Sequence, residues 1–131
     1  MTVVKPRLMA VLMALFMVSP LALAGDRFEP YSEARLEAAQ AEGRPVFIEV
    51  AADWCSTCKR QAPLIEALLA EPAFSEYVAL KIDWDAEESA ARALGAPRQS
   101  TLFVYKDGEQ IAMSVAETNP EKLRSLLEKG L

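Results

Sequence analysis

The sequence predicts an α/β sandwich in which helices cover both faces of one mixed sheet. Segments typical of helix and of strand alternate along the chain. Residues Val46–Ala51 form a nearly continuous apolar run, which is typical of a central strand buried on both faces. Near the end of the chain, Asp107-Gly108 separates two strand-like segments and predicts a hairpin, so the last two strands are expected to be antiparallel.

The N-terminal residues 1–24 are typical of a signal peptide. Lys5 and Arg7 supply a basic start, an apolar run follows, and Ala22-Leu23-Ala24 provides a small-x-small cleavage site. An uncleaved anchor is the alternative, but Pro20 interrupts the run and its 17 residues are fewer than the ~20 that span a bilayer. We therefore expect a periplasmic or otherwise exported protein without a stable membrane anchor after cleavage, with a single domain over residues 25–131.

The charge balance disfavours nucleic acid as a partner. The chain has 14 basic and 19 acidic residues, and loss of Lys5 and Arg7 with the signal peptide leaves 12 basic residues. Such a domain is acidic overall. Export would also place its cysteines in a compartment that permits disulfides.

The first half of the mature chain predicts an irregular start and then helix, strand and helix. Residues Ser32–Glu42 are good helix formers, with Ser32 as the N-cap and Gly43 as the stop. The strand Val46–Ala51 follows. A second helix is expected from Cys55 to about Ala70, with a kink at Pro63.

The middle of the chain predicts a strand between two helical segments. A short helical turn near Pro72 to Tyr77 leads into the strand Val78–Asp83. Residues Asp85–Leu94 are rich in Ala and Glu and predict a helix that ends at Gly95.

The last third predicts the hairpin and a closing helix. Residues Thr101–Tyr105 are typical of a strand, residues 106–109 form the turn, and Gln110–Val115 pairs back. Asn119-Pro120 then supplies a cap and a first helical residue for a helix that stops at Gly130.

The two cysteines of the chain form a Cys-x-x-Cys motif, Cys55-Ser56-Thr57-Cys58, directly behind the central strand. When the second cysteine lies one helical turn after the first, their sulfurs can form a disulfide and the first can cap the helix. Backbone N–H groups and the helix dipole then favour a thiolate at Cys55, lowering its pKa by roughly one unit. Lys59 and the indole of Trp54 are the nearest residues that would lower it further. We expect the Cys55 sulfur to be exposed at the helix start.

Two other uses of the cysteine pair are weighed against redox chemistry. A purely structural bridge across four residues stabilises by roughly 2 kcal/mol, which is near the low end for disulfides. One Cys-x-x-Cys without histidine cannot form a closed four-ligand zinc site, although two thiolates could hold Cu(I) or bridge a dimer. The lack of histidine also excludes Cys-His hydrolysis and haem attachment.

The sequence resembles the thioredoxin family over nearly the whole mature chain. The landmarks are Trp54-Cys55-x-x-Cys58-Lys59, Pro63, Lys81, Asp85 and the segment Thr101–Gly108. Two further stretches, Ala52–Cys55 and Glu71–Phe74, are similar to the periplasmic C-terminal domain of DsbD-type reductases.

This resemblance implies a thioredoxin fold and thiol-disulfide exchange with protein substrates, with Cys55 as nucleophile and Cys58 as resolving cysteine. It implies no cofactor and therefore an upstream thiol electron donor. Lys59 and Lys81 are the basic catalytic candidates. The client is expected to contact Trp54, Gln99, Ser100 and Thr101. We favour reduction over oxidation or isomerisation. The alternative is a binding module or Cu(I) metallochaperone that uses the dithiol without turnover.

Glu49 departs from the family pattern, in which an Asp is usual beneath the second cysteine. Burial disfavours the charged carboxylate, so we expect a raised pKa and a general base that takes the Cys58 proton through a water molecule. The longer Glu side chain could instead reach Lys81 and form a structural pair.

Ser100 is the second departure, because the family has a cis-proline at this place before the penultimate strand. A cis bond before a residue other than proline costs about 3–4 kcal/mol. We therefore predict a trans bond, or a cis bond strained by the fold. Its hydroxyl is expected near the sulfurs.

Overall fold

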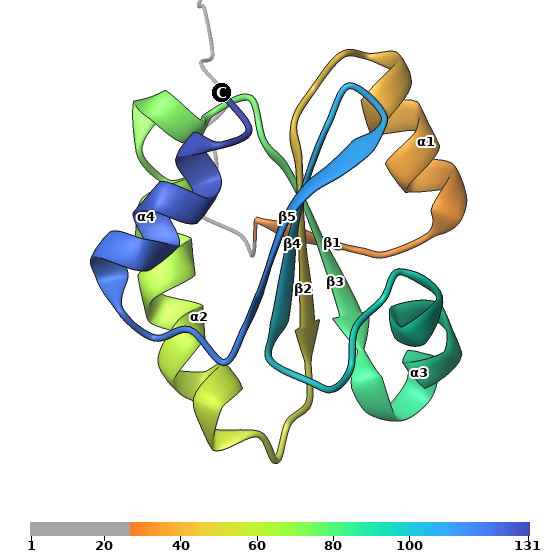
Figure 1. Cartoon of the computed structure of the whole chain (residues 1–131), viewed down its shortest axis with the longest axis vertical. Helices are drawn as coiled ribbons and strands as arrows, with labels where there is room; N and C mark the ends of the chain where they lie inside the picture. The colour runs from red at the N-terminus through yellow and green to blue at the C-terminus, as the bar shows by residue number, and fades with distance from the viewer. Residues whose placement is uncertain (1–26) are drawn as a thin grey trace, which may run out of the picture.

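The computed structural model describes residues 27–131, which form one five-stranded sheet with helices on both faces (Figure 1). The strands are β1 (Phe28–Pro30), β2 (Val46–Ala51), β3 (Val78–Asp83), β4 (Thr101–Lys106) and β5 (Glu109–Val115). Their order in the sheet is β1-β3-β2-β4-β5. Strand β3 runs parallel to β1 and β2, whereas β4 is antiparallel to both β2 and β5. The predicted mixed sheet is confirmed, and the predicted signal peptide lies outside the described residues.

Four α-helices cover the sheet, two on each face (Figure 1). On one face are α1 (Glu33–Ala41) and α3 (Trp84–Ala93), and on the other α2 (Ser56–Leu69) and α4 (Pro120–Glu128). A one-turn 3-10 helix, Pro72–Phe74, follows α2. Strand β2 is buried along almost its whole length because side chains from both layers cover it. No helix among residues 27–131 is long and apolar enough to cross a membrane.

Local sequence signals start and end the elements as expected. Ser32 caps α1 by accepting a hydrogen bond from the Arg35 backbone N–H at 3.1 Å. The β4–β5 turn has positive φ angles at Asp107 (52°) and Gly108 (79°), the geometry that tight hairpins require. Pro63 lies inside α2, and the kink expected there stays a prediction.

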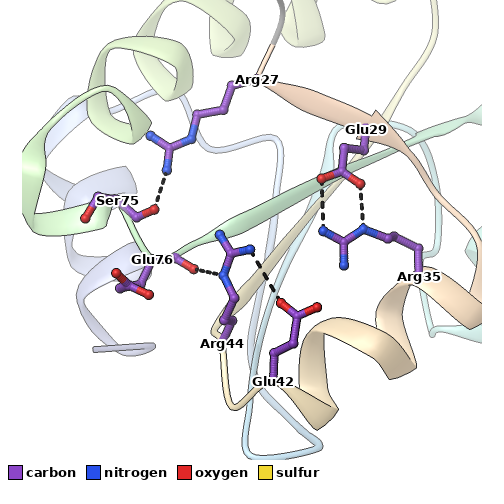
Figure 2. Close-up of polar contacts among 7 residues, drawn as sticks. All are labelled: Arg27, Glu29, Arg35, Glu42, Arg44, Ser75 and Glu76. Carbon is purple, nitrogen blue, oxygen red and sulfur yellow. Dashed lines mark hydrogen bonds and ion pairs between the residues drawn. The ribbon is translucent and has the colours of Figure 1, made fainter. Parts of the chain in front are cut away.

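Strand β1 contradicts the predicted irregular start. It has three residues and pairs only with β3, so it is too short to show an alternating pattern. Side-chain contacts with residues outside the strand hold this segment in place instead (Figure 2). Glu29 on β1 accepts two hydrogen bonds from Arg35 of α1, at 2.6 and 3.0 Å, and Arg27 donates to the Ser75 carbonyl at 3.2 Å.

Candidate active site

The cysteine motif lies where β2 ends and α2 begins. Cys55 is the N-cap of α2, and its sulfur accepts a hydrogen bond from the Cys58 backbone N–H at 3.1 Å. The two Cα atoms are 5.2 Å apart and the sulfurs form a disulfide. The predicted cap and the predicted pairing are both confirmed, so the helix start holds the pair in the geometry that reversible disulfide chemistry needs.

The expectation of an exposed Cys55 sulfur is wrong for this disulfide form. Cys55 and Cys58 are each only 4% exposed. They form a small cluster with Ala52, and Trp84 packs against it. Trp84, at the start of α3, is therefore an aromatic neighbour of the cysteine pair. Burial follows because the sulfurs are bonded to one another and have neighbours from β2 and α3.

A pocket of about 280 Å³ opens beside Cys58. Its lining residues are Glu49, Ala51, Ala52, Asp53, Cys58, Lys59, Ala62, Lys81, Ile82 and Asp83. The pocket thus brings together Cys58 and the three predicted charged candidates, Glu49, Lys59 and Lys81, which come from β2, α2 and β3. It has the volume of several water molecules, each of which takes about 30 Å³ in the liquid.

Glu49 and Lys81 are direct partners in the β2–β3 ladder. The Lys81 Nζ lies 3.6 Å from Glu49 Oε2, and the Glu49 residue is only 2% exposed. The ammonium group also lies over the ring of Phe28, 5.4 Å from its centroid. The predicted Glu49–Lys81 pair therefore exists, while Glu49 still reaches the pocket that contains Cys58.

Trp54 stands on the surface next to the disulfide, with 59% of its area exposed. Its indole N–H donates to both oxygens of the Asp85 carboxylate, at 2.9 and 3.1 Å. A large apolar side chain that is exposed and held in one orientation suits contact with a client protein.

The segment before β4 is fixed by its own hydrogen bonds. The described residues contain no cis peptide bond, so the bond before Ser100 is trans, as first predicted. Ser100 has a left-handed φ of 60°, and its N–H donates to the Val50 carbonyl at 2.7 Å. Its hydroxyl donates to the Gln99 carbonyl, while the Thr101 hydroxyl donates to the Arg98 carbonyl, each at 2.6 Å.

Of the four predicted client residues, only two reach the surface in this form. Trp54 is exposed and Gln99 is partly exposed, whereas Ser100 and Thr101 are completely buried. The Ser100 hydroxyl is engaged with its neighbouring carbonyl.

Sequence reasoning missed Gln61, which is completely buried on α2. The available signal was a polar residue three positions after Cys58, on a helical face that continues with Ile65 and Leu68. It also missed the hydrogen bond between Trp54 and Asp85, because 31 residues separate the two. Within residues 27–131 no group of three or more His, Cys, Asp or Glu side chains is placed to hold a metal ion.

Comparison with known proteins agrees with this geometry. The thioredoxin family model matches residues 30–129. The chain is 35% identical to thioredoxin H-type of Chlamydomonas reinhardtii over 97 residues, which are 74% of this chain and 84% of the relative. The crystal structure of Trxlp from Edwardsiella tarda superimposes with a TM-score of 0.73 at 39% identity, covering 76% of this chain and 97% of that one. A mutant thioredoxin from Halobacterium salinarum gives a TM-score of 0.68 at 26% identity, covering 79% and 88%.

A mixed sheet with a Cys-x-x-Cys disulfide at the start of its α2 helix defines a thiol-disulfide oxidoreductase. The family match covers most of the described residues and several relatives share the fold. The chain belongs to the thioredoxin family.

Proposed function

We propose that this protein is an exported reductase of protein disulfides that receives its electrons from an upstream dithiol. The observation that carries the proposal is the Cys55–Cys58 disulfide at the start of α2, with Glu49 and Cys58 lining one pocket. Reduction is favoured by the acidic residue at position 49 and by the likeness of Ala52–Cys55 and Glu71–Phe74 to the C-terminal domain of DsbD-type reductases. Thioredoxins among the relatives support protein disulfides as the substrate class.

The first step is attack of the Cys55 thiolate on a client disulfide. A bond forms between Cys55 and one client sulfur, and the other client sulfur leaves as a thiolate that takes up a proton. The helix start stabilises the attacking thiolate, because backbone N–H groups such as that of Cys58 point at the Cys55 sulfur.

The second step releases the client. Cys58 loses its proton and attacks the Cys55 sulfur, which breaks the mixed disulfide and frees the second client thiol. Two electrons and two protons have then passed to the client, and the chain is in the disulfide state described above. A dithiol donor restores the reduced form by the same exchange in reverse.

Glu49 is proposed as the base that accepts the Cys58 proton. Both residues line the pocket, whose volume accommodates the water molecule through which the proton would pass. The Lys81 ammonium group pairs with the Glu49 carboxylate and holds it in place. Lys59 also lines the pocket and adds positive charge beside the resolving cysteine.

Export is proposed from residues 1–24 alone. Their basic start, apolar run and cleavage site are typical of a signal peptide. Intact mass spectrometry of material recovered outside the cytoplasm tests this. We expect a chain that begins at Gly25, and a mass that retains Met1 to Ala24 would contradict cleavage.

The direction of the reaction is tested by insulin reduction with dithiothreitol, together with the equilibrium potential of the Cys55–Cys58 pair. We expect turnover in the wild type and its loss in Cys55→Ser. A potential close to that of strong oxidants, about −120 mV, would contradict a reductive role. Stoichiometric Cu(I) binding without turnover would favour the binding module instead.

A further inference from the structure

Ser100 and Ala116, which flank the neighbouring strands β4 and β5, share a strained left-handed φ. Their φ angles are 60° and 59°, a region that residues with a Cβ rarely occupy. They lie just outside the paired positions Thr101 and Val115, and the Ala116 N–H donates to the Ser100 carbonyl at 2.9 Å. Such a conformation persists only where surrounding contacts hold it.

Gln61 supplies one of these contacts from α2. Its side-chain Nε2 donates to the Glu117 carbonyl at 3.0 Å and approaches the Ser100 carbonyl at 3.4 Å. Both partners are acceptors, so the amide group must present its nitrogen to them. The Gln61 side chain therefore joins α2, which carries Cys58, to the residue before β4 and to the loop after β5.

The burial of the Gln61 amide lowers the stability of the fold. Gln61 is completely buried, and its Oε1 has no hydrogen-bond partner among the residues that the structure describes. The neighbouring buried positions on α2, Ile65 and Leu68, are apolar. A buried amide with an unpaired oxygen contributes less to stability than an apolar side chain of the same size would, so its hydrogen bonds point to a role other than stability.

We propose that Gln61 is a positioning residue for client binding. It holds Ser100 and the adjoining Gln99 at a fixed place relative to the cysteine pair, the task that a rigid proline would otherwise perform before β4. The inference rests on the proposed function, because it takes Gln99, which is partly exposed beside the buried Ser100, as part of the surface that receives a client. Cys55 and Cys58 keep their chemistry without Gln61, but the client is less well aligned with them.

The test compares Gln61→Met, which keeps the length of the side chain and removes its donors, with Ile65→Val, a buried control on the same helix. For insulin reduction, Gln61→Met is expected to raise KM about tenfold, the effect of losing a buried hydrogen bond, with kcat within about twofold. Cystamine is a disulfide too small to contact both the cysteine pair and the segment before β4. The rate at which Gln61→Met reduces cystamine is therefore expected to match that of Ile65→Val. The alkylation rate of Cys55 is expected to be the same in both variants.

A double-mutant cycle separates positioning from general destabilisation. Glycine adopts a left-handed φ without penalty, so in a Ser100→Gly background Gln61→Met is expected to raise KM by less than about threefold. An effect of full size in that background would overturn the proposal, as would an unchanged KM in the single variant.

Amide hydrogen exchange provides a measurement that does not depend on turnover. In Gln61→Met we expect the Ser100 and Ala116 amides to exchange about tenfold faster, and in Ile65→Val we expect no selective change there. If the wild type failed to reduce insulin, the proposed function would be wrong, and exchange would still decide whether Gln61 holds the loop. Unchanged exchange at both amides would overturn that role.

Discussion

Glu49 and Lys81 form an ion pair in which only one member reaches solvent. The carboxylate lies in the pocket beside Cys58 at the centre of the sheet, while 42% of the Lys81 side chain is exposed. The pair is compatible with both interpretations of the sequence, because the Glu49 carboxylate is held by Lys81 while Glu49 lines the same pocket as Cys58. Which role dominates is a kinetic question.

Glu49→Gln tests the proposed base. The amide keeps the size of the side chain but does not accept a proton, so release of a trapped client by Cys58 is expected to slow about 100-fold. Rapid-quench measurement of the mixed disulfide detects this step directly. Attack by Cys55 serves as the internal control and is expected to change little. Equal slowing of both steps, or normal release with reduced stability, would assign Glu49 a structural role.

Asp85→Ala tests the orientation of Trp54. Without the carboxylate the exposed indole loses its fixed position, and client binding must then restrict it, which costs about 0.5–1.5 kcal/mol. The expected result is a fall in kcat/KM for insulin of up to about tenfold, together with lower fluorescence anisotropy of the indole. Glu88→Ala on the same helix is the matched control, since Glu88 pairs with Arg92 and not with Trp54. A similar loss in both variants would attribute the effect to α3 as a whole.

Ser100→Pro is expected to destabilise the fold, although proline is the residue that the family has at this place. Proline fixes φ near −65° and has no N–H, whereas Ser100 has a φ of 60° and donates to Val50. The expected loss in the free energy of unfolding is about 3 kcal/mol, measured by urea denaturation. Ser100→Ala, which keeps the backbone N–H, is expected to lose only about 1 kcal/mol. An unchanged midpoint for the proline variant would mean that the loop can adopt a different backbone.

Tyr77 makes the free energy of unfolding depend on pH in the alkaline range. Its hydroxyl donates to the Leu127 carbonyl at 2.6 Å, and burial raises the pKa of Tyr77 to about 12, outweighing the lowering effect of the Gly130 backbone N–H. Below about pH 10 both the folded and the unfolded chain keep this proton. Between pH 10 and 12 the unfolded chain releases it first, so the free energy of unfolding is expected to fall by about 2–3 kcal/mol.

Tyr77→Phe is the control for that pH dependence. Burial also raises the pKa of Tyr31 and of Tyr105, so the informative quantity is the difference between wild type and variant at each pH. This difference is expected to shrink from pH 9 to pH 12. If it stayed constant, Tyr77 would not be the group responsible.

Gly130→Ala tests the packing around the same tyrosine. A Cβ at position 130 would collide with the Tyr77 hydroxyl and approach its ring carbon Cζ to 2.8 Å. Tyr77 is only 2% exposed and its hydroxyl is bonded, so the ring has little freedom to withdraw. We expect a loss of about 1–3 kcal/mol in the free energy of unfolding. Lys129→Ala, at an exposed neighbouring position, is expected to stay within about 0.5 kcal/mol of the wild type.

Features that depend on local sequence could be predicted well. The apolar run of β2, the cap at Ser32 and the turn at Asp107-Gly108 each depend on residues that are adjacent or nearly so, and all three appear in the structure. The trans bond before Ser100 also follows from a local cost.

Features that depend on contacts between distant segments could not be predicted in this way. Strand β1 exists through its pairing with β3, which is distant in the sequence. The burial of Cys55 comes from neighbours on other elements, including Trp84 at the start of α3. Gln61 meets Glu117 across 56 positions of the chain.

The near-complete burial of the disulfide has a consequence for its lifetime. A thiolate must reach a sulfur along the line of the S–S bond, so any thiol that reduces this disulfide requires the surrounding side chains to move aside first. The rate at which the closed form is reduced is therefore expected to depend on how often that opening occurs.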